Sequence, residues 1–187
     1  MLIQLNQDAF KESHPTQSFF MLFNDIHEGT AKDCCEWIMS ANFQEKDRPE
    51  VLNLMIMSHG GELASGFSII DCIRGSSIPV RTIALGCVAS AGLMISMAGQ
   101  KGHRVVTPNT SIMSHQFSGG FASKSHELIA AVREFDLTAE RMINHYKKCT
   151  GLKEKDIKKY LLPPQDVYLT AQEAVKLGLA DIVSDLS

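Results

Sequence analysis

The sequence lacks the features that mark disulfide-stabilised and zinc-binding proteins. Its five cysteines form no CxxC pair, and their spacing relative to the seven histidines matches no metal site. We therefore expect neither a disulfide framework nor a metal site. We expect a reducing, cytoplasmic location. The first ten residues also lack the basic flank and the apolar stretch of a signal peptide.

The sequence also lacks an excess of one charge and a long apolar run. Its 18 Lys and Arg residues face 21 Asp and Glu residues without a block of like charge, so neither a nucleic acid nor a membrane is expected as a partner. Residues 82–100 are uncharged, but interruptions such as Gly86, Ser90 and Gly92 favour a strand, a turn and a helix over a membrane span. The 187 residues, 44% of them hydrophobic, can bury a sizeable core and fall in the single-domain range.

Apolar runs and segments with helical spacing alternate along the chain. Residues 51–57, VLNLMIM, are nearly all apolar, which is typical of a parallel strand buried on both faces. The alternation predicts an α/β fold with right-handed crossovers. The expected strands are residues 19–23, 51–57, 80–85, 105–108, 112–114 and an edge strand near Ile182, and the expected helices are residues 29–42, 63–74, 91–98 and 171–178.

A longer helix is expected over residues 123–149, which contain no Pro or Gly. Apolar or small side chains recur there at steps of 4, 3, 4, 3 and 4, at Leu128, Val132, Phe135, Ala139, Met142 and Tyr146. Such a helix would extend roughly 40 Å, about the width of the domain. The pattern fits either a long core helix or an arm for self-association.

Two glycine-marked turns follow expected strands and precede expected helices, at residues 58–61 and 89–92. Such turns present free backbone N–H groups that can hold an oxyanion, and Ser90 lies in one of them. His115 follows the strand 112–114, and Asp166 lies in a Pro-containing turn before the last helix. Each residue also fits a structural role, but the three would form a nucleophile, a base and an orienting carboxylate if the fold brought them together.

The serine site of the α/β-hydrolases does not fit these residues. Its nucleophile turn requires Gly two residues before Ser, where this chain has Val88. Its histidine follows the acidic residue, whereas Asp166 follows every histidine in this sequence.

From Asn53 onward, several motifs in collinear order resemble those of the proteolytic subunit of the Clp protease. Residues 58–61, SHGG, are similar to its Ser-Pro-Gly-Gly turn, and residues 86–92, GCVASAG, to its nucleophile turn. Residues 113–116, MSHQ, resemble its histidine motif, and residues 166–174, DVYLTAQEA, the segment that begins with its aspartate. The resemblance implies one ClpP/crotonase-like ββα spiral domain over residues 1–187, with a projecting handle helix.

The resemblance implies a serine endopeptidase subunit of the ATP-dependent type, which hydrolyses peptide bonds of unfolded polypeptides inside an oligomeric chamber through an acyl-enzyme. By position it implies that Ser90 is the nucleophile, His115 the general base and Asp166 the orienting carboxylate. The amides of Gly61 and Ala91 would form the oxyanion hole, and the strand at Gly119 and Gly120 would pair with the substrate.

The resemblance also implies partners. The helix at 123–149 resembles the handle that interlocks two seven-membered rings, which favours the self-association arm. No cofactor is expected in this chain, because a separate AAA+ unfoldase would use the ATP; a paralogous subunit is a further expected partner. Residues 1–18 diverge from the family, and Gln165 replaces the arginine that commonly forms ring-to-ring ion pairs, so easily separated rings are expected.

Two other functions remain open. A ring subunit retained only for assembly would be expected to have lost triad residues. A crotonase-type acyl-CoA enzyme also uses two backbone amides as an oxyanion hole, but it would not need Ser90, His115 and Asp166 as a set.

Overall fold

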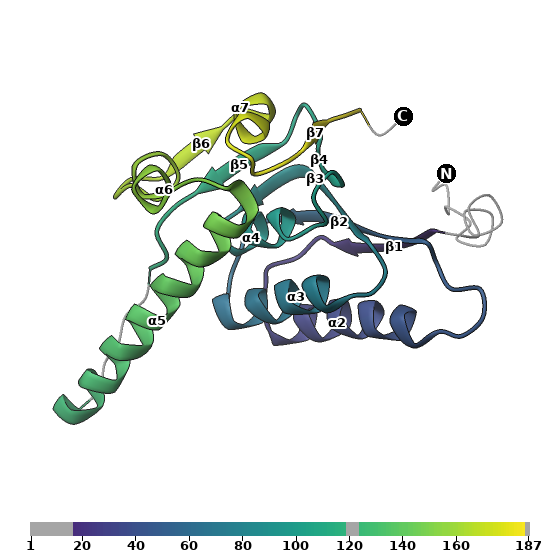
Figure 1. The fold of residues 1–187 in the computed structure, drawn as a ribbon. Coiled ribbons are helices and arrows are strands. Elements are labelled where there is room, and N and C mark those ends of the chain that lie inside the picture. The colour runs from purple at the N-terminus through teal and green to yellow at the C-terminus, as the bar shows by residue number, and fades with distance from the viewer. Residues whose placement is uncertain (1–16, 119–123, 186–187) are drawn as a thin grey trace, which may run out of the picture.

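A computed structural model describes residues 17–118 and 124–185, which are built around a seven-stranded sheet (Figure 1). Five strands lie in the order β1-β2-β3-β4-β7 and pair in parallel. The first half of β3 pairs with β4 and its second half with β5, which also pairs antiparallel with β6. The strands are β1 (Gln17–Leu22), β2 (Val51–Ser58), β3 (Val80–Ala89), β4 (Arg104–Val106), β5 (Ser111–Ser114), β6 (Val167–Leu169) and β7 (Ile182–Val183).

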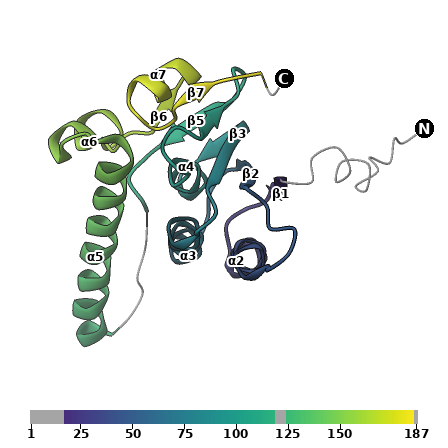
Figure 2. The ribbon, with the colours of Figure 1, turned by 45° about the vertical axis from the view of Figure 1, so that its right-hand side comes forward.

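The helices cover both sides of this sheet. α2 and α3 lie side by side below the strands in Figure 1, and α7 lies on the opposite side, an arrangement that Figure 2 repeats. α4 is buried along its whole length beside β3. The helices are α2 (Glu28–Phe43), α3 (Leu63–Gly75), α4 (Ala91–Met97), α5 (Ser125–Thr150), α6 (Glu154–Tyr160) and α7 (Ala171–Lys176).

The parallel α/β architecture predicted from the sequence is confirmed, with one boundary that matters for function. β3 continues to Ala89 rather than ending at residue 85, because Gly86 adopts a φ of 65° and the pairing with β2 shifts register there. Ile56 pairs with Ala84, but Ser58 pairs with Val88. The irregular strand therefore carries the chain directly to Ser90.

Two elements were not among the sequence predictions. α6 follows α5, and β6 lies between Asp166 and α7, so Asp166 precedes a short strand instead of the last helix. Both elements are short, and β6 is recognisable only through its pairing with β5. Since three residues give no usable periodicity, the sequence could not reveal this strand.

The long helix α5 is confirmed within two residues of its expected bounds, and its N-terminal part projects from the body (Figures 1 and 2). Its apolar stripe changes environment along the helix: Val132 is 60% exposed, whereas Met142 and Tyr146 are buried. The side chain of Leu128 lies outside the described residues. The C-terminal half of the stripe therefore belongs to the core, and the expectation of a self-association arm concerns the exposed N-terminal half.

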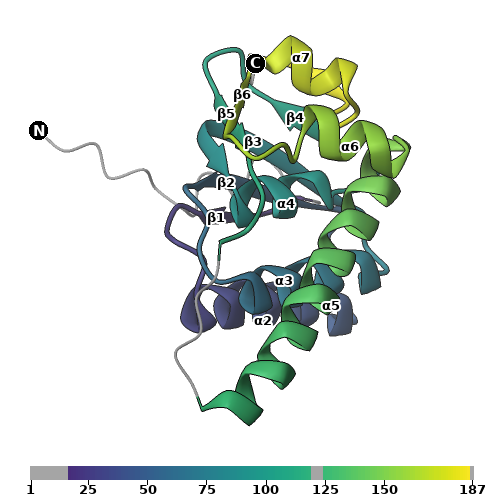
Figure 3. The same ribbon diagram turned by 90° about the vertical axis from the view of Figure 1, so that its left-hand side faces the viewer.

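The C-terminal end of α5 is tied to the sheet through a buried arginine. Arg104 on β4 donates to the backbone carbonyls of Cys149 and Gly178 and pairs with the Asp181 carboxylate. Figure 3 shows this end of α5 beside α6, below α7. No described helix combines the length and the apolar composition needed to cross a membrane.

Candidate active site

Ser90 lies at the junction of β3 and α4 in a conformation that non-glycine residues rarely adopt. Its φ is 53° and its ψ is −124°, which turns the chain sharply from the strand into the helix. The Ser90 amide donates to the carbonyl of Met113 on β5, and the Ser90 carbonyl accepts from the amide of Met94. These bonds fix the backbone on both sides of a strained residue.

The pairing of β5 with β3 brings His115 to Ser90. Ala89 pairs with Met113, so the residues that follow both strands emerge at the same edge of the sheet. His115 Nε2 lies 2.8 Å from Ser90 Oγ, within hydrogen-bond distance. The nucleophile and the base expected from the sequence are therefore in contact, and both side chains are only partly buried, which leaves room for a substrate.

Asp166 lies beside His115 but does not hydrogen-bond to it. β6 pairs antiparallel with β5 and sets Val167 opposite Ser114, which places Asp166 next to His115. The Asp166 Oδ1 to His115 Nδ1 distance is 3.7 Å, close enough for electrostatic attraction but too long for a hydrogen bond. The Asp166 side chain is 54% exposed. Asp166, the third expected residue, is therefore adjacent to His115, but no hydrogen bond joins them in this single chain.

The two glycine-marked turns meet at Ser90. A Cβ on Gly60 would lie 2.7 Å from the Ser90 Cβ, and Gly60 has a φ of 102°, so only glycine fits there. Gly61 has a φ of 143° and packs against the backbone of Ile26. Among the described residues, the turn and cap hydrogen bonds use neither the Gly61 amide nor the Ala91 amide. Both expected oxyanion donors are therefore available near Ser90.

The expected substrate-binding residues, Gly119 and Gly120, lie outside the described residues. The segment before them is anchored, because the ring of Phe117 packs on that of Phe135 of α5, with centroids 4.4 Å apart. On another turn beside Ser90, His59 Nδ1 lies 3.5 Å from Cys87 Sγ. Burial raises the pKa of the Cys87 thiol, which keeps it protonated and a poor nucleophile at neutral pH.

Sequence reasoning missed the polar side chains that support the site from behind. Ser114 Oγ lies 2.8 Å from Tyr146 Oη and donates to the carbonyl of Leu161, and the Gln116 amide donates to the carbonyl of Leu162. The signal was weak: Ser114 breaks the apolar pattern of β5, and Tyr146 was counted only as part of the apolar stripe.

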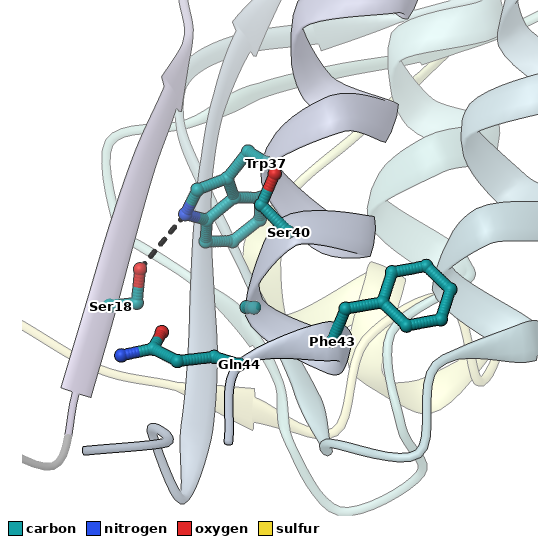
Figure 4. A pocket seen from close by; sticks show the side chains of 6 residues that line it. Ser18, Trp37, Ser40, Phe43 and Gln44 are labelled. Carbon is teal, nitrogen blue, oxygen red and sulfur yellow. Dashed lines mark hydrogen bonds between the residues drawn. The ribbon is translucent and has the colours of Figure 1, made fainter. Parts of the chain in front are cut away.

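A hollow of about 500 Å³ lies elsewhere, between β1 and α2 (Figure 4). It is lined by Trp37, Phe43 and Gln44, and the indole N–H of Trp37 donates to Ser18 Oγ across its edge. Ser18 belongs to the beginning of β1, whereas Ser90 follows the end of β3, and these strands run parallel within one sheet. The hollow therefore lies at the opposite edge of the sheet and takes no part in the serine site.

Within the two described stretches, no group of three His, Cys, Asp or Glu side chains is arranged to hold a metal ion. His59, on the turn beside Ser90, is exposed, and its ring lies against the thiol of Cys87. The groups that converge on Ser90 are therefore a hydroxyl, an imidazole, a carboxylate and backbone amides, which is the composition of a serine-nucleophile site.

Comparisons with known proteins agree with this composition. The family model described as Clp protease matches residues 9–186. A solved structure of a point mutant of ClpP1 from Listeria monocytogenes is similar with a TM-score of 0.79 and 24% sequence identity, covering 97% of this chain and 96% of that one. The solved structure shares the fold, and the family model spans nearly the whole sequence. The chain therefore belongs to the Clp protease family and is a serine-type endopeptidase.

Proposed function

We propose that this chain cleaves peptide bonds of unfolded polypeptides with Ser90 as the nucleophile, His115 as the general base and Asp166 as the group that orients the imidazole. The observation that carries the proposal is the 2.8 Å contact between His115 Nε2 and Ser90 Oγ, formed between residues from separate strands. The rare backbone conformation of Ser90 supports the same role, since strain of this kind is concentrated at functional sites.

The chemistry proceeds in two halves. Ser90 Oγ forms a bond to the substrate carbonyl carbon while His115 Nε2 takes the hydroxyl proton, and the amides of Gly61 and Ala91 donate to the resulting oxyanion. The C–N bond then breaks, and His115 gives its proton to the leaving amine. Water attacks the acyl-enzyme with His115 again as the base, which releases the acid product and restores the Ser90 hydroxyl.

Asp166 must move closer to take part. A hydrogen bond to His115 Nδ1 requires about 2.8 Å, whereas the single chain has 3.7 Å. We propose that contacts made on assembly close this gap, because Asp166 is exposed and follows the exposed residues 164–165. Gly119 and Gly120 would pair with the main chain of an extended peptide, a mode of binding that disregards side-chain sequence.

Assembly is the second half of the proposal. Members of the Clp protease family form oligomers, and the exposed stripe on the projecting part of α5 supplies an apolar surface for self-association. We propose seven-membered rings, stacked in pairs, that enclose the serine sites in a chamber in the cytoplasm. An AAA+ unfoldase that uses ATP would deliver unfolded substrates to the rings, or a paralogous subunit would complete the rings. This chain itself would use no cofactor.

Labelling with a fluorophosphonate tests the chemistry directly, because the probe reacts only with an activated serine. We expect wild-type protein to be labelled at Ser90 and Ser90→Ala to be unlabelled, with peptidase activity lower by about 10⁴-fold or more. Ser68→Ala is the matched control, since Ser68 is an exposed serine on α3. Unlabelled wild-type protein would favour a subunit kept for assembly, and thioester turnover that survives Ser90→Ala would favour an acyl-CoA enzyme.

A further inference from the structure

Two adjacent residues at the buried end of α5 contact the elements that carry the nucleophile and the base. His145 and Tyr146 are 2% and 0% exposed, although both have polar groups that need partners. Tyr146 reaches β5, which leads to His115, and His145 reaches α4, which begins after Ser90.

The bonds around Tyr146 have a defined direction. Ser114 Oγ donates its single proton to the carbonyl of Leu161 at 2.6 Å, so the bond of 2.8 Å between Ser114 and Tyr146 is donated by the tyrosine hydroxyl. Ser114 immediately precedes His115. The Tyr146 hydroxyl therefore donates to the Ser114 hydroxyl, which in turn fixes the end of β5 next to His115.

The same bonds reach the segment that carries Asp166. Ser114 bonds to the carbonyl of Leu161, and Gln116 Nε2 donates to the carbonyl of Leu162 at 2.9 Å. Both neighbours of His115 are therefore bonded to residues that lie four or five positions before Asp166. These bonds set the spacing between the imidazole and the segment of its carboxylate.

The bonds around His145 also have one possible direction. Arg74 Nη2 lies 2.7 Å from His145 Nδ1 and can only donate, so the ring proton is on Nε2 and is donated to the carbonyl of Met94 at 2.8 Å. In a regular α-helix that carbonyl would accept from the amide of Ala98, which here donates to Ile95. Burial, together with the charge of Arg74, lowers the pKa of His145 to about 4, so the ring is neutral at physiological pH.

We propose, on the basis of the serine peptidase function above, that Tyr146, Ser114 and His145 are positioning residues that hold His115 and the helix after Ser90 in the geometry needed for proton transfer. Apolar side chains would fill the same space without directing any group, whereas these hydrogen bonds specify one arrangement. Both contacts arise from one turn of α5, so the buried end of this helix is bonded both to the strand before His115 and to the helix after Ser90.

The test removes one hydroxyl and leaves the packing intact. Tyr146→Phe keeps the ring, and Tyr160→Phe, at an exposed position at the end of α6, is the matched control. At a temperature well below melting, we expect Tyr146→Phe to lower both kcat and the rate of fluorophosphonate labelling of Ser90 about tenfold, with KM changed by less than about twofold. The control is expected to match wild type, and the sedimentation profile to stay the same in all three proteins.

A double-mutant cycle separates positioning from general damage to the fold. Ser114→Ala removes this bond together with the bond to Leu161, so adding Tyr146→Phe to Ser114→Ala is expected to lower the labelling rate little further. If Tyr146→Phe lowered only the melting temperature, with kcat and labelling unchanged, the inference would be overturned and the proposed function would stand. Wild-type protein that resists the fluorophosphonate would overturn both.

Discussion

The backbone around Ser90 shows how individual residues create the site. A serine at φ 53° is held by hydrogen bonds to β5 and to α4, and Gly60 leaves no side chain beside the Ser90 Cβ. A non-glycine residue in this region of φ costs about 1–3 kcal/mol, so the surrounding contacts must keep it in place. The backbone geometry therefore directs the partly buried hydroxyl of Ser90 toward His115.

Gly61 is expected to contribute to catalysis through its backbone amide. A Cβ at this position would lie 2.3 Å from the carbonyl oxygen of Ile26, at a φ of 143° that disfavours any side chain. Gly61→Ala should displace the proposed oxyanion donor and lower kcat about 10²- to 10³-fold, the usual effect of losing one donor. A fluorogenic peptide assay measures this effect.

Gly75→Ala serves as the control for that substitution. Gly75 ends α3, and a Cβ there would meet nothing within 4 Å. Unchanged activity is expected for this variant. Equal activity of the two variants would show that the Gly61 amide takes no part in catalysis.

At the scale of residues, the sequence located the side chains that meet at Ser90 but not the side chains that support them. Ser90 and His115 stand in short motifs, so a local pattern sufficed to find them. The hydrogen bond between Ser114 and Tyr146 joins residues 32 positions apart, and no local sequence pattern predicts it. The distance between Asp166 and His115 is likewise fixed by the pairing of β5 with β6, which no local pattern predicts.

The helix α5 carries residues that serve both proposals, catalysis and self-association. Its buried end carries the contacts to the site, and its exposed end carries Ile129, 76% exposed, and Val132. A single helix can serve both because 3.6 residues per turn keep an apolar stripe on one side along its whole length. The spacing of apolar residues predicted the helix, but only the tertiary structure shows which part of it is buried against the rest of the domain.

Self-association is expected to depend on the exposed half of the stripe. Burying a valine side chain contributes about 1.5 kcal/mol, which corresponds to about tenfold in a dissociation constant. Val132→Glu should therefore raise the protein concentration needed for assembly at least about tenfold, since it also adds the dehydration of a charge. Analytical ultracentrifugation at several concentrations measures this shift.

Ala130→Glu provides the matched control on α5. Ala130 is exposed, and at 100° per residue it lies on the side of the helix opposite Val132. This variant is expected to assemble like wild type. Equal loss of assembly in both variants would show that added charge, and not the apolar stripe, controls association.

At the scale of the whole molecule, the ion pair between buried Arg104 and partly buried Asp181 connects β4, the end of α5 and the loop before β7. Burial by itself would raise the pKa of Asp181, but the hydrogen bonds and charge of Arg104 outweigh it and lower that pKa. The carboxylate therefore stabilises the fold above its unfolded pKa of about 3.9, and that stability is lost as the pH falls through the lowered value.

Asp181→Asn tests this connection. Removing one partner of a buried pair leaves Arg104 as an uncompensated charge, so the free energy of unfolding at pH 7 should fall by about 3 kcal/mol. The difference from wild type should shrink as the pH falls below the unfolded pKa of about 3.9 and through the lowered pKa of the folded state, because wild-type Asp181 then also becomes neutral. Thermal unfolding at pH 7 and at low pH measures it, and a difference that did not change with pH would contradict the role of the charge.

The concentration dependence of activity tests the link between assembly and catalysis. Gln165 lacks the charge-assisted hydrogen bond that an arginine would supply to the ring contact, and such bonds contribute about 1.5–3 kcal/mol each. We expect paired rings to separate on dilution and peptidase activity per subunit to fall with the paired fraction, as the gap between Asp166 and His115 reopens. Sedimentation beside a fluorogenic peptide assay follows both quantities. Full activity from single rings or monomers would contradict this prediction.

The sequence by itself determined the alternation of strands and helices, the bounds of the long helix and the identity of the groups that converge at Ser90. These features depend on local periodicity, on the absence of Gly and Pro from one segment and on short motifs. The tertiary structure alone decided the extension of β3 past Gly86, the added strand β6, the open distance at Asp166 and the polar contacts of His145 and Tyr146. Each of these depends on pairing or burial between residues distant in the chain, where the free energy comes from contacts that no single segment contains.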